Sequence, residues 1–493
     1  MSAPVVSKQQ AVCLAQTFID TVDVGIDLRH CVVHSVDFSS RNIDTLYLLE
    51  RFGYPHVKRL IQEKGLVYAY WVLRGQDAQK GSVSLSIDSR NGRVVGFELA
   101  GHAWGQRDNC LLDKAAALKA ATDFIAAQGS DIALFQSEPQ LNKNIAGQPL
   151  ESFLCWVSKK PLINEIHDAL FLKVKEGVVS FSKGLTLPQR FKDRYYKDIL
   201  FSQTWFFVAL GLSFVLSVIM VVIAFLKRKQ LDWKLGKIYA VVLGLFFFVT
   251  NLTEETMFSV SADIVFKLIS VLMFSLAVMV TVSVTRDCFR ESFARDIFNN
   301  KKEPLAARVI IGYSFAFISF IGVLGFYSVL MHFRLVWDVG IDKIAGGIFT
   351  SKNMYWTPFA LAALPAVTEE FFRGFTIAFC KKKFKSSLLA VVVAAFIWGF
   401  LHTSTDGSMY PGVFAGIEKF LTGIAAGYLL LLAGIEVAIL WHFVNNFLAA
   451  SIFLFLPGIN LAGYALVLLI LVILPFFAAI YFYYKPQGKR VLG

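Results

Sequence analysis

Three charged side chains stand within five positions in the segment PAVTEEFFRGF, residues 365–375, although the surrounding sequence is apolar. Glu369 and Arg373 are spaced i, i+4, and Glu370 and Arg373 are spaced i, i+3. On a helix the arginine is therefore able to hold one carboxylate while the other stays available. A charge inside a bilayer costs on the order of 3 kcal/mol, so such groups are expected to face a protein interior and to be functional. An ion pair that only joins two helices is the alternative for this segment alone.

Two later apolar segments add imidazole and amide groups. FIWGFLH ends at His402, and ILWHFVNN places His442 and Asn446 four residues apart on one helical face. Polar groups from three separate segments would satisfy one another in a hydrated pocket. The set predicts hydrolysis, with a glutamate as general base on a water and a histidine that assists it or holds a metal. The asparagine and the other histidine would stabilise the tetrahedral intermediate.

The elements that carry these residues are predicted to cross a membrane. The chain has 493 residues, of which 56% are hydrophobic and 47 are Phe, with a mean hydropathy of +0.57. This composition is too apolar for a soluble protein of this size. Apolar runs of bilayer-spanning length follow Trp205. They predict about eight to nine spans, near 202–226, 237–252, 262–283, 308–331, 356–380, 386–403, 411–432, 435–455 and 462–484.

Basic residues predict the orientation of these spans. Alternate connections are rich in Lys and Arg, such as KRKQLDWKLGK and CKKKFK, whereas NLTEETMFSVSAD and HTSTDGSMYPG have none. The positive-inside rule then places the C-terminus in the cytoplasm and the N-terminal part outside, in what we expect to be the cell membrane. The net charge of +12 is explained by topology and needs no nucleic-acid partner. No export signal is visible at the start, so we expect a preceding signal or span.

The N-terminal 200 residues show an internal repeat. SKQQAVCLAQTFI at 7–19 and DKAAALKAATDFI at 113–125 share a capping residue and matching Ala, Phe and Ile positions. A sequence typical of β-strands follows each of these two segments, with hairpin turns expected at Asn91-Gly92 and Glu176-Gly177. This pattern resembles tandem PepSY-like modules, small extracytoplasmic units attached to membrane proteases. A sensing or inhibitory role would follow from that resemblance alone.

The predicted fold class is mainly α, a polytopic membrane helix bundle preceded by an α+β soluble region of two repeats. We expect the first module at 1–105, the second at 106–200, accessory transmembrane helices at 201–300 and a catalytic bundle at 301–493.

Three motifs between about 308 and 455 resemble the CPBP family of intramembrane proteases, which process prenylated (CAAX) proteins and bacteriocins (Abi). PAVTEEFFRG, WGFLH and HFVNN stand where that family has its Glu-Glu-x-x-x-Arg, F-x-x-x-H and H-x-x-x-N motifs. The resemblance implies that Glu369 or Glu370 and His402 activate the water, and that Arg373 fixes the acidic pair. His442 and Asn446 would stabilise the oxyanion. A divalent metal such as zinc is compatible with the family, with His402, His442 and Glu369 as candidate ligands.

Two positions depart from the family pattern. Thr368 stands where the family has its first Glu and Glu369 where it has its second, so Glu370 lies one residue late, about 100° around a helix. Trp398 replaces the motif Phe and keeps an aromatic wall. The first departure leaves the identity of the base open. It also leaves two other functions open, an inactive receptor or scaffold of the same family and a proton-coupled transporter. The substrate would be a peptide or protein at the membrane.

Overall fold

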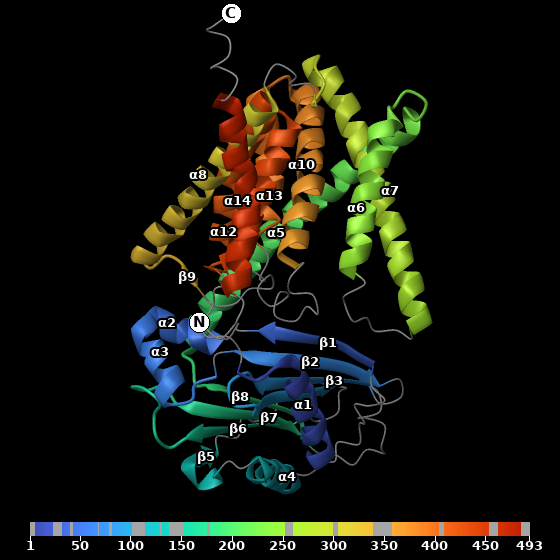
Figure 1. Cartoon of the computed structure of the whole chain (residues 1–493). Coiled ribbons are helices and arrows are strands. Elements are labelled where there is room, and N and C mark those ends of the chain that lie inside the picture. The colour runs from blue at the N-terminus through green and yellow to red at the C-terminus, as the bar shows by residue number, and fades with distance from the viewer. Residues whose placement is uncertain are drawn as a thin grey trace, which may run out of the picture.

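The computed structural model describes the chain in stretches separated by gaps. The described residues are 5–22, 32–39, 43–67, 69–77, 81–100, 114–128, 131–137, 152–174, 178–251, 260–298, 304–338, 357–403, 409–452 and 462–484. Within them the chain is mainly helical, and an N-terminal part that contains a sheet lies at one end of a helix bundle (Figure 1). The predicted division into a mixed α and β region and a helical region is therefore confirmed.

Eight antiparallel strands form one sheet in the order β1-β2-β3-β4-β8-β7-β6-β5. Their bounds are β1 Val32–Ser39, β2 Tyr70–Asp77, β3 Gly81–Asp88, β4 Val94–Ala100, β5 Phe135–Ser137, β6 Ser152–Ser158, β7 Asp168–Val174 and β8 Val178–Leu185. The alternation of apolar residues in the sequence produces this sheet, because one face of each strand packs on a core. The β4–β8 pairing joins the two halves.

The two predicted helices of the repeat are present as α1 (Lys8–Val22) and α4 (Lys114–Ala127). They share one core with both halves of the sheet, so the two halves are packed as one unit. A row of rings crosses this core, with centroids 5.6 Å apart for Phe18 and Phe97 and 5.4 Å apart for Phe97 and Phe124. The predicted turn between β3 and β4 is confirmed, with Gly92 at φ 72°. The second predicted turn, at 176–177, lies outside the described residues.

The sheet region contacts the bundle through a second apolar cluster. It gathers α2 (Ile43–Phe52), α3 (Tyr54–Glu63), the start of α5, and a two-stranded ribbon of β9 (Trp337–Asp338) and β10 (Met409–Tyr410). The Tyr410 hydroxyl donates to Asp198 at 2.6 Å, and its ring stacks on Tyr195 at 5.3 Å. Thr403 donates to the Ser202 carbonyl at 2.9 Å. These contacts join α5 to the loop that follows His402.

Nine helices make up the described part of the bundle (Figure 1). They are α5 Gln189–Leu226, α6 Trp233–Asn251, α7 Val260–Phe293, α8 Leu305–His332, α10 Thr357–Phe384, α11 Ser387–Phe400, α12 Val413–Ala433, α13 Ile435–Ile452 and α14 Ala462–Tyr484. Each overlaps one of the predicted spans. Within the described residues, six of them are long and apolar enough to cross a membrane: α5, α6, α7, α8, α12 and α14.

The predicted count of eight to nine spans is not confirmed, for two physical reasons. α11 has 14 residues, which is about 21 Å of helix and shorter than a hydrocarbon core of about 30 Å. The apolar part of α13, Ile435–Ser451, is also short. α10 has the length of a span, but its charged residues Glu369, Glu370 and Arg373 lie near its middle. These three helices pack against one another and against neighbouring helices of the bundle, where Glu370 pairs with Arg373 and His442.

Small residues bring α11 and α12 into close contact. A Cβ added to Gly399 of α11 would lie 2.6 Å from the backbone nitrogen of Phe420 and 2.8 Å from the carbonyl oxygen of Gly416. Gly423 of α12 packs against Trp398 and Ala395 in the same way. Helices in membranes associate through such small residues, because close backbone approach replaces the hydrophobic effect. The contact fixes the end of α11 that carries His402.

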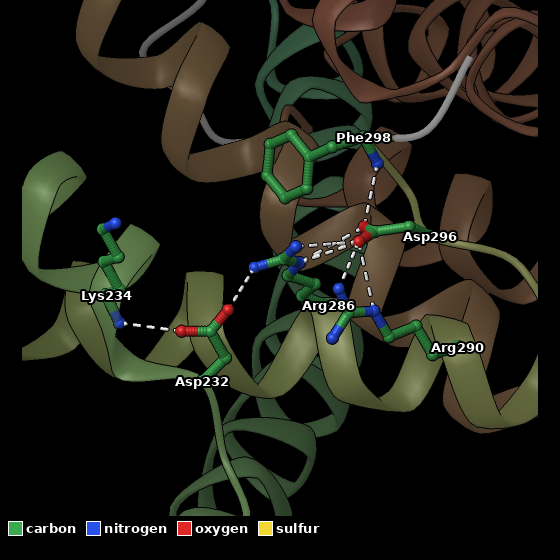
Figure 2. A network of polar contacts seen from close by, with 6 residues as sticks. All are labelled: Asp232, Lys234, Arg286, Arg290, Asp296 and Phe298. Carbon is green, nitrogen blue, oxygen red and sulfur yellow. Dashed lines mark hydrogen bonds and ion pairs between the residues drawn. The ribbon is translucent and has the colours of Figure 1, made fainter. Parts of the chain in front are cut away.

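At the end of the bundle away from the sheet, the short segment 294–298 is held by a network of charges (Figure 2). Asp296 accepts hydrogen bonds from Arg286 Nε at 3.0 Å and from Arg290 Nε at 3.1 Å, and Arg286 also pairs with Asp232 at 2.5 Å. Burial alone would raise the pKa of Asp296. The hydrogen bonds from Arg286, the Phe298 backbone and Arg290 outweigh burial and hold this pKa below its usual value.

Candidate active site

The centre of α10 presents two neighbouring carboxylates to different surroundings. Glu370 is fully buried and accepts hydrogen bonds from Arg373 and, at 2.8 Å, from Nδ1 of His442. Glu369 is one residue earlier, about 100° around the helix, and its side chain is 33% exposed. Its Oε2 accepts a hydrogen bond from the indole Nε1 of Trp398 at 2.5 Å. The pair is therefore divided into one carboxylate in an ion pair and one that remains accessible.

His442, on α13, lies between the two carboxylates. A carboxylate only accepts hydrogen bonds, so Nδ1 carries the proton in the contact with Glu370. Its other nitrogen, Nε2, then faces Glu369, with 3.7 Å between Nε2 and Oε2. This distance is too long for a direct hydrogen bond and suits a shared water.

His402 lies just past the end of α11 and contacts the same group of side chains. Its Nδ1 is 2.7 Å from the carbonyl oxygen of Trp398, one turn earlier. Because a carbonyl oxygen accepts, Nδ1 is the donor in this contact. The ring packs edge-on against Trp398, with centroids 5.1 Å apart. These two contacts fix the orientation of the ring and leave its Nε2 atom outside the bond to the carbonyl oxygen.

Arg373 is almost completely buried beneath these groups. Its guanidinium carbon lies 4.4 Å from the centre of the Trp398 ring, within the range of a cation–π contact. In the described part of the chain, its Nε and Nη2 atoms have no hydrogen-bond partner, and neither does Oε2 of Glu370. The arginine thus offsets the charge of Glu370 and keeps donors free for another group.

A cavity of about 520 Å³ opens beside Glu369. Its polar lining includes Thr368, Glu369, Arg373 and His402, whereas most of the remaining wall is apolar. The wall is formed by four helices and comprises Ser213 of α5, Phe274, Ala277, Val278, Thr281 and Val282 of α7, Val367, Phe371, Phe372 and Thr376 of α10, and Ala394, Ile397, Trp398 and Leu401 of α11. A carboxylate and an imidazole therefore share a space that is otherwise suited to apolar groups.

Five of the six predicted site residues form one constellation: Glu369, Glu370, Arg373, His402 and His442. Asn446 lies one turn after His442 on α13 and is half-buried. Among the hydrogen bonds of the described residues, none joins Asn446 to the other five. Its neighbour Asn445 is buried, and no partner for its Oδ1 occurs among those same residues.

The residues do not fit the metal site that the sequence allowed. Across the described ranges, no group of three or more His, Cys, Asp or Glu side chains is arranged to hold a metal ion. The predicted ligands His402, His442 and Glu369 thus form no metal site in this arrangement.

Sequence reasoning missed two parts of this site. It treated Trp398 as an aromatic wall, whereas the indole N–H of this residue contacts Glu369 directly. The departure from Phe at this position was the available signal. It also treated α5 and α7 as accessory, whereas both line the cavity. The sequence gives no signal for that, because their cavity residues are small or apolar and resemble any other part of a span.

The fold and site together define a multi-pass membrane protein with polar groups from three helices gathered beside an internal cavity. The sequence model of the type II CAAX prenyl endopeptidase Rce1-like family matches residues 351–448, the segment that carries all six predicted site residues. This segment is similar to a family of membrane proteases. Comparison with curated proteins and with solved structures finds no significant match. The likeness of the N-terminal halves to PepSY-like modules stays a prediction.

Proposed function

We propose that the protein is an intramembrane endopeptidase that cleaves a peptide bond of a membrane-associated protein or peptide. The observation that carries the proposal is the pairing of Glu369 and His402 on one cavity, next to a buried Glu370–Arg373–His442 cluster. The match to a protease family over the same residues supports it. The cell membrane is the proposed location, with the sheet region outside, because the basic connections lie at the opposite end of the bundle.

In the proposed reaction, Glu369 accepts a proton from a water held between it and the Nε2 atom of His402. The water oxygen forms a bond to the substrate carbonyl carbon, and the carbonyl oxygen becomes an oxyanion. Glu369 then returns the proton to the amide nitrogen as the carbon–nitrogen bond breaks. The direct products are a carboxylic acid and an amine, which exchange one proton to become a carboxylate and an ammonium group, so atoms and charges balance.

The oxyanion needs donors, and we propose three candidates: His442, Asn446 and Arg373. His442 contacts Glu370 through Nδ1, and its Nε2 atom would be the donor to the oxyanion. Asn446 would donate through its amide, as the sequence predicted, and Arg373, a residue of the cavity lining, has buried N–H groups without a partner among the described residues. Preorganised donors of this kind are each worth about 10²–10³ in rate in other hydrolases.

The cavity wall indicates the class of substrate. Most residues that line it on α7, α10 and α11 are apolar, so the residues on either side of the scissile bond should be apolar as well. Whether the substrate also carries a lipid is a separate question. A cleavage assay that includes lipidated and unlipidated versions of one peptide would answer it.

The central experiment incubates the purified protein in detergent with a library of peptides and identifies new termini by mass spectrometry. We expect cleavage by wild type and by Glu98→Gln, which changes an exposed carboxylate of β4 far from the cavity. We expect no cleavage by Glu369→Ala or His402→Ala, although both should accumulate in the membrane.

Two other outcomes separate the alternative functions. If wild type and the His402 and Glu369 variants cleave equally, or if none of them cleaves, the endopeptidase proposal fails. Loss of solute uptake in the Glu369 variant would then favour a proton-coupled transporter. A cellular phenotype that survives loss of both Glu369 and Glu370 would favour an inactive receptor.

A further inference from the structure

Trp398 contacts both of the groups proposed to activate the water. Its side chain donates from Nε1 to Glu369, and its backbone carbonyl accepts from Nδ1 of His402. The same ring lies 4.4 Å from the Arg373 guanidinium carbon and 5.7 Å from the His442 ring, measured to ring centres. Trp398 is thus the common neighbour of the four polar groups around it.

The indole ring itself has little freedom to move. It is 9% exposed, and Gly423 of α12 packs against it so closely that an added Cβ would lie 3.0 Å from its Cε3 atom. The helix that carries it is held against α12 at Gly399. An N–H group on such a rigid support fixes the position of its acceptor, because the acceptor must come to the donor.

This donor contacts Glu369, the residue next to the substituted motif position 368. The motif that this segment resembles has Phe at position 398, which has no N–H, and its first Glu at position 368, where this chain has Thr. One hydrogen bond joins the substituted residue Trp398 to Glu369, the residue that follows Thr368. The side chain of Glu369 leaves the helix about 100° away from that of residue 368, so Glu369 needs a donor of its own to face the cavity.

We propose that Trp398 is a positioning residue that turns Glu369 toward the cavity and His402, and so compensates for the absence of a carboxylate at position 368. This inference rests on the proposed function. Thr368 lines the same cavity, so a carboxylate at either position would reach the same space.

Trp398→Phe tests the inference, because it removes the N–H group and keeps a ring over Arg373. We expect kcat to fall about 10- to 100-fold with KM changed less than about threefold, since outer groups that orient a catalytic residue have effects of this size. The matched control is Trp441→Phe, which also removes a buried indole N–H bond, here 2.8 Å to Ser319 of α8. The control should retain kcat within about threefold.

A second variant tests the compensation. Adding Thr368→Glu to Trp398→Phe restores the motif, and we expect it to recover at least about fivefold of the lost kcat. In the wild-type background, Thr368→Glu should give no increase. A Trp398→Phe protein as active as wild type overturns the positioning role. A double variant no better than Trp398→Phe overturns the compensation.

A measurement without turnover separates this inference from the proposed function. An apolar carbodiimide modifies carboxyl groups inside membranes, and in wild type the indole N–H bond occupies Oε2 of Glu369. Labelling of Glu369, followed by mass spectrometry, should be several-fold faster in Trp398→Phe than in wild type or Trp441→Phe. If wild type cleaves no peptide, the proposed endopeptidase function is wrong. Equal labelling rates of Glu369 in Trp398→Phe and in wild type would by themselves refute the positioning role of Trp398.

Discussion

Two adjacent glutamates with identical side chains lie in different surroundings in this site. The spacing on a helix explains it, since successive residues point about 100° apart. Glu370 is directed into the bundle, where Arg373 and His442 surround it, and Glu369 is directed at the cavity. A buried ion pair holds the helices in place, whereas an accessible carboxylate is free for chemistry.

Removing the charge from each glutamate should therefore give opposite results. Glu369→Gln should abolish cleavage and change the midpoint of thermal unfolding by only a degree or two. Glu370→Gln should lower the free energy of unfolding by about 3–5 kcal/mol, because it leaves Arg373 as an uncompensated buried charge. Thermal unfolding of both variants in the same detergent, beside the cleavage assay, makes the comparison. Equal unfolding midpoints for the two would contradict it.

The sequence was sufficient to find these residues but not to divide their tasks. Intramembrane charges are costly, so Glu369, Glu370, Arg373, His402 and His442 were conspicuous from their types and setting alone. Which glutamate faces the cavity depends on the rotation of α10, and that rotation is set by packing against α7, α11 and α13. No local pattern encodes it. The indole bond from Trp398 was hidden for the same reason.

At the scale of single elements, close helix contacts determine where the site residues lie. Gly399 lies three residues before His402 and allows α11 to approach the backbone of α12. The next residue inward from this contact is Trp398. A change in the spacing of these two helices therefore moves Trp398 and His402 together.

Gly399→Ala should separate the two helices and reduce both stability and activity. The added Cβ would meet backbone atoms at 2.6–2.8 Å, which cannot rotate away, so we expect a loss of about 1–3 kcal/mol and a large fall in kcat. Gly322→Ala in α8 is the matched control, because its Cβ would meet nothing within 4 Å. That control should be neutral or slightly stabilising. Unfolding midpoints and cleavage rates for the pair decide the matter.

The segment after α7 has a comparable role at the other end of the bundle. Phe298 packs on Phe371 of α10 with ring centres 5.8 Å apart, and the Ile297 carbonyl accepts from the Ile435 backbone N–H at 3.3 Å. Asp296 ties this segment to α7 through Arg286 and Arg290 (Figure 2). The network therefore supports the helix that carries the glutamates.

The lowered pKa of Asp296 gives this support a defined pH dependence. A carboxylate whose pKa is lower in the folded protein contributes stability in full above its unfolded pKa, here about 4, and loses it as the pH falls through the folded pKa. Thermal unfolding of wild type and Asp296→Asn should differ clearly at pH 7, and the difference should shrink below pH 4. A constant difference from pH 7 to pH 3 would contradict the assignment.

Helix positions were predictable because apolar runs and basic connections are strong local patterns. The number of spans was not, because length alone does not say whether an apolar helix contacts lipid or other helices. α11 and α13 have the composition of a span without its length, and α10 has the length without the composition. Such helices form the centre of the bundle, which is where the site lies.

Across the whole molecule, the sheet region and the bundle are joined beside the site. Tyr410 lies in β10, a few residues after His402, and contacts Asp198 and Tyr195 at the start of α5. Burial, first of all, and the hydrogen bond to Asp198 raise the pKa of Tyr410, so the hydroxyl stays protonated and donates throughout the physiological range. Thr403 bonds the same helix through Ser202.

Tyr410→Phe should loosen this junction without unfolding either part. Loss of one partly buried hydrogen bond costs about 0.5–1.5 kcal/mol. We expect faster amide hydrogen exchange at residues 409–416 and unchanged exchange in β2 and β3. Leu388→Ala, at an exposed position at the far end of α11, is a suitable reference change. Unchanged exchange at 409–416 would show that the hydroxyl does not hold the junction.

The sequence predicted two repeats, and the structure joins their strands into one sheet through β4 and β8. Local periodicity identified the helices and strands of each half. The pairing between halves, and the contact between Asp198 and Tyr410, bring together residues far apart in the chain. Such long-range contacts leave no mark in the local pattern of a single sequence. The helices and strands of each half were therefore predictable, whereas the pairing of the two halves and their contact with the bundle were not.

α5 runs unbroken for 38 residues, from the base of the sheet to the far side of the bundle. At 1.5 Å per residue this is a rod of about 57 Å, nearly twice the thickness of the hydrocarbon core. Because the helix has no break, a rotation at one of its ends turns the part of the protein attached to the other end. One residue inserted near Tyr196 would rotate the sheet by about 100° around the helix axis relative to the bundle. Seven inserted residues would almost restore the original orientation and would move the sheet about 10 Å further from the bundle. The length of α5 and the contacts of Tyr410 and Thr403 with it thus set the orientation and the height of the sheet region together.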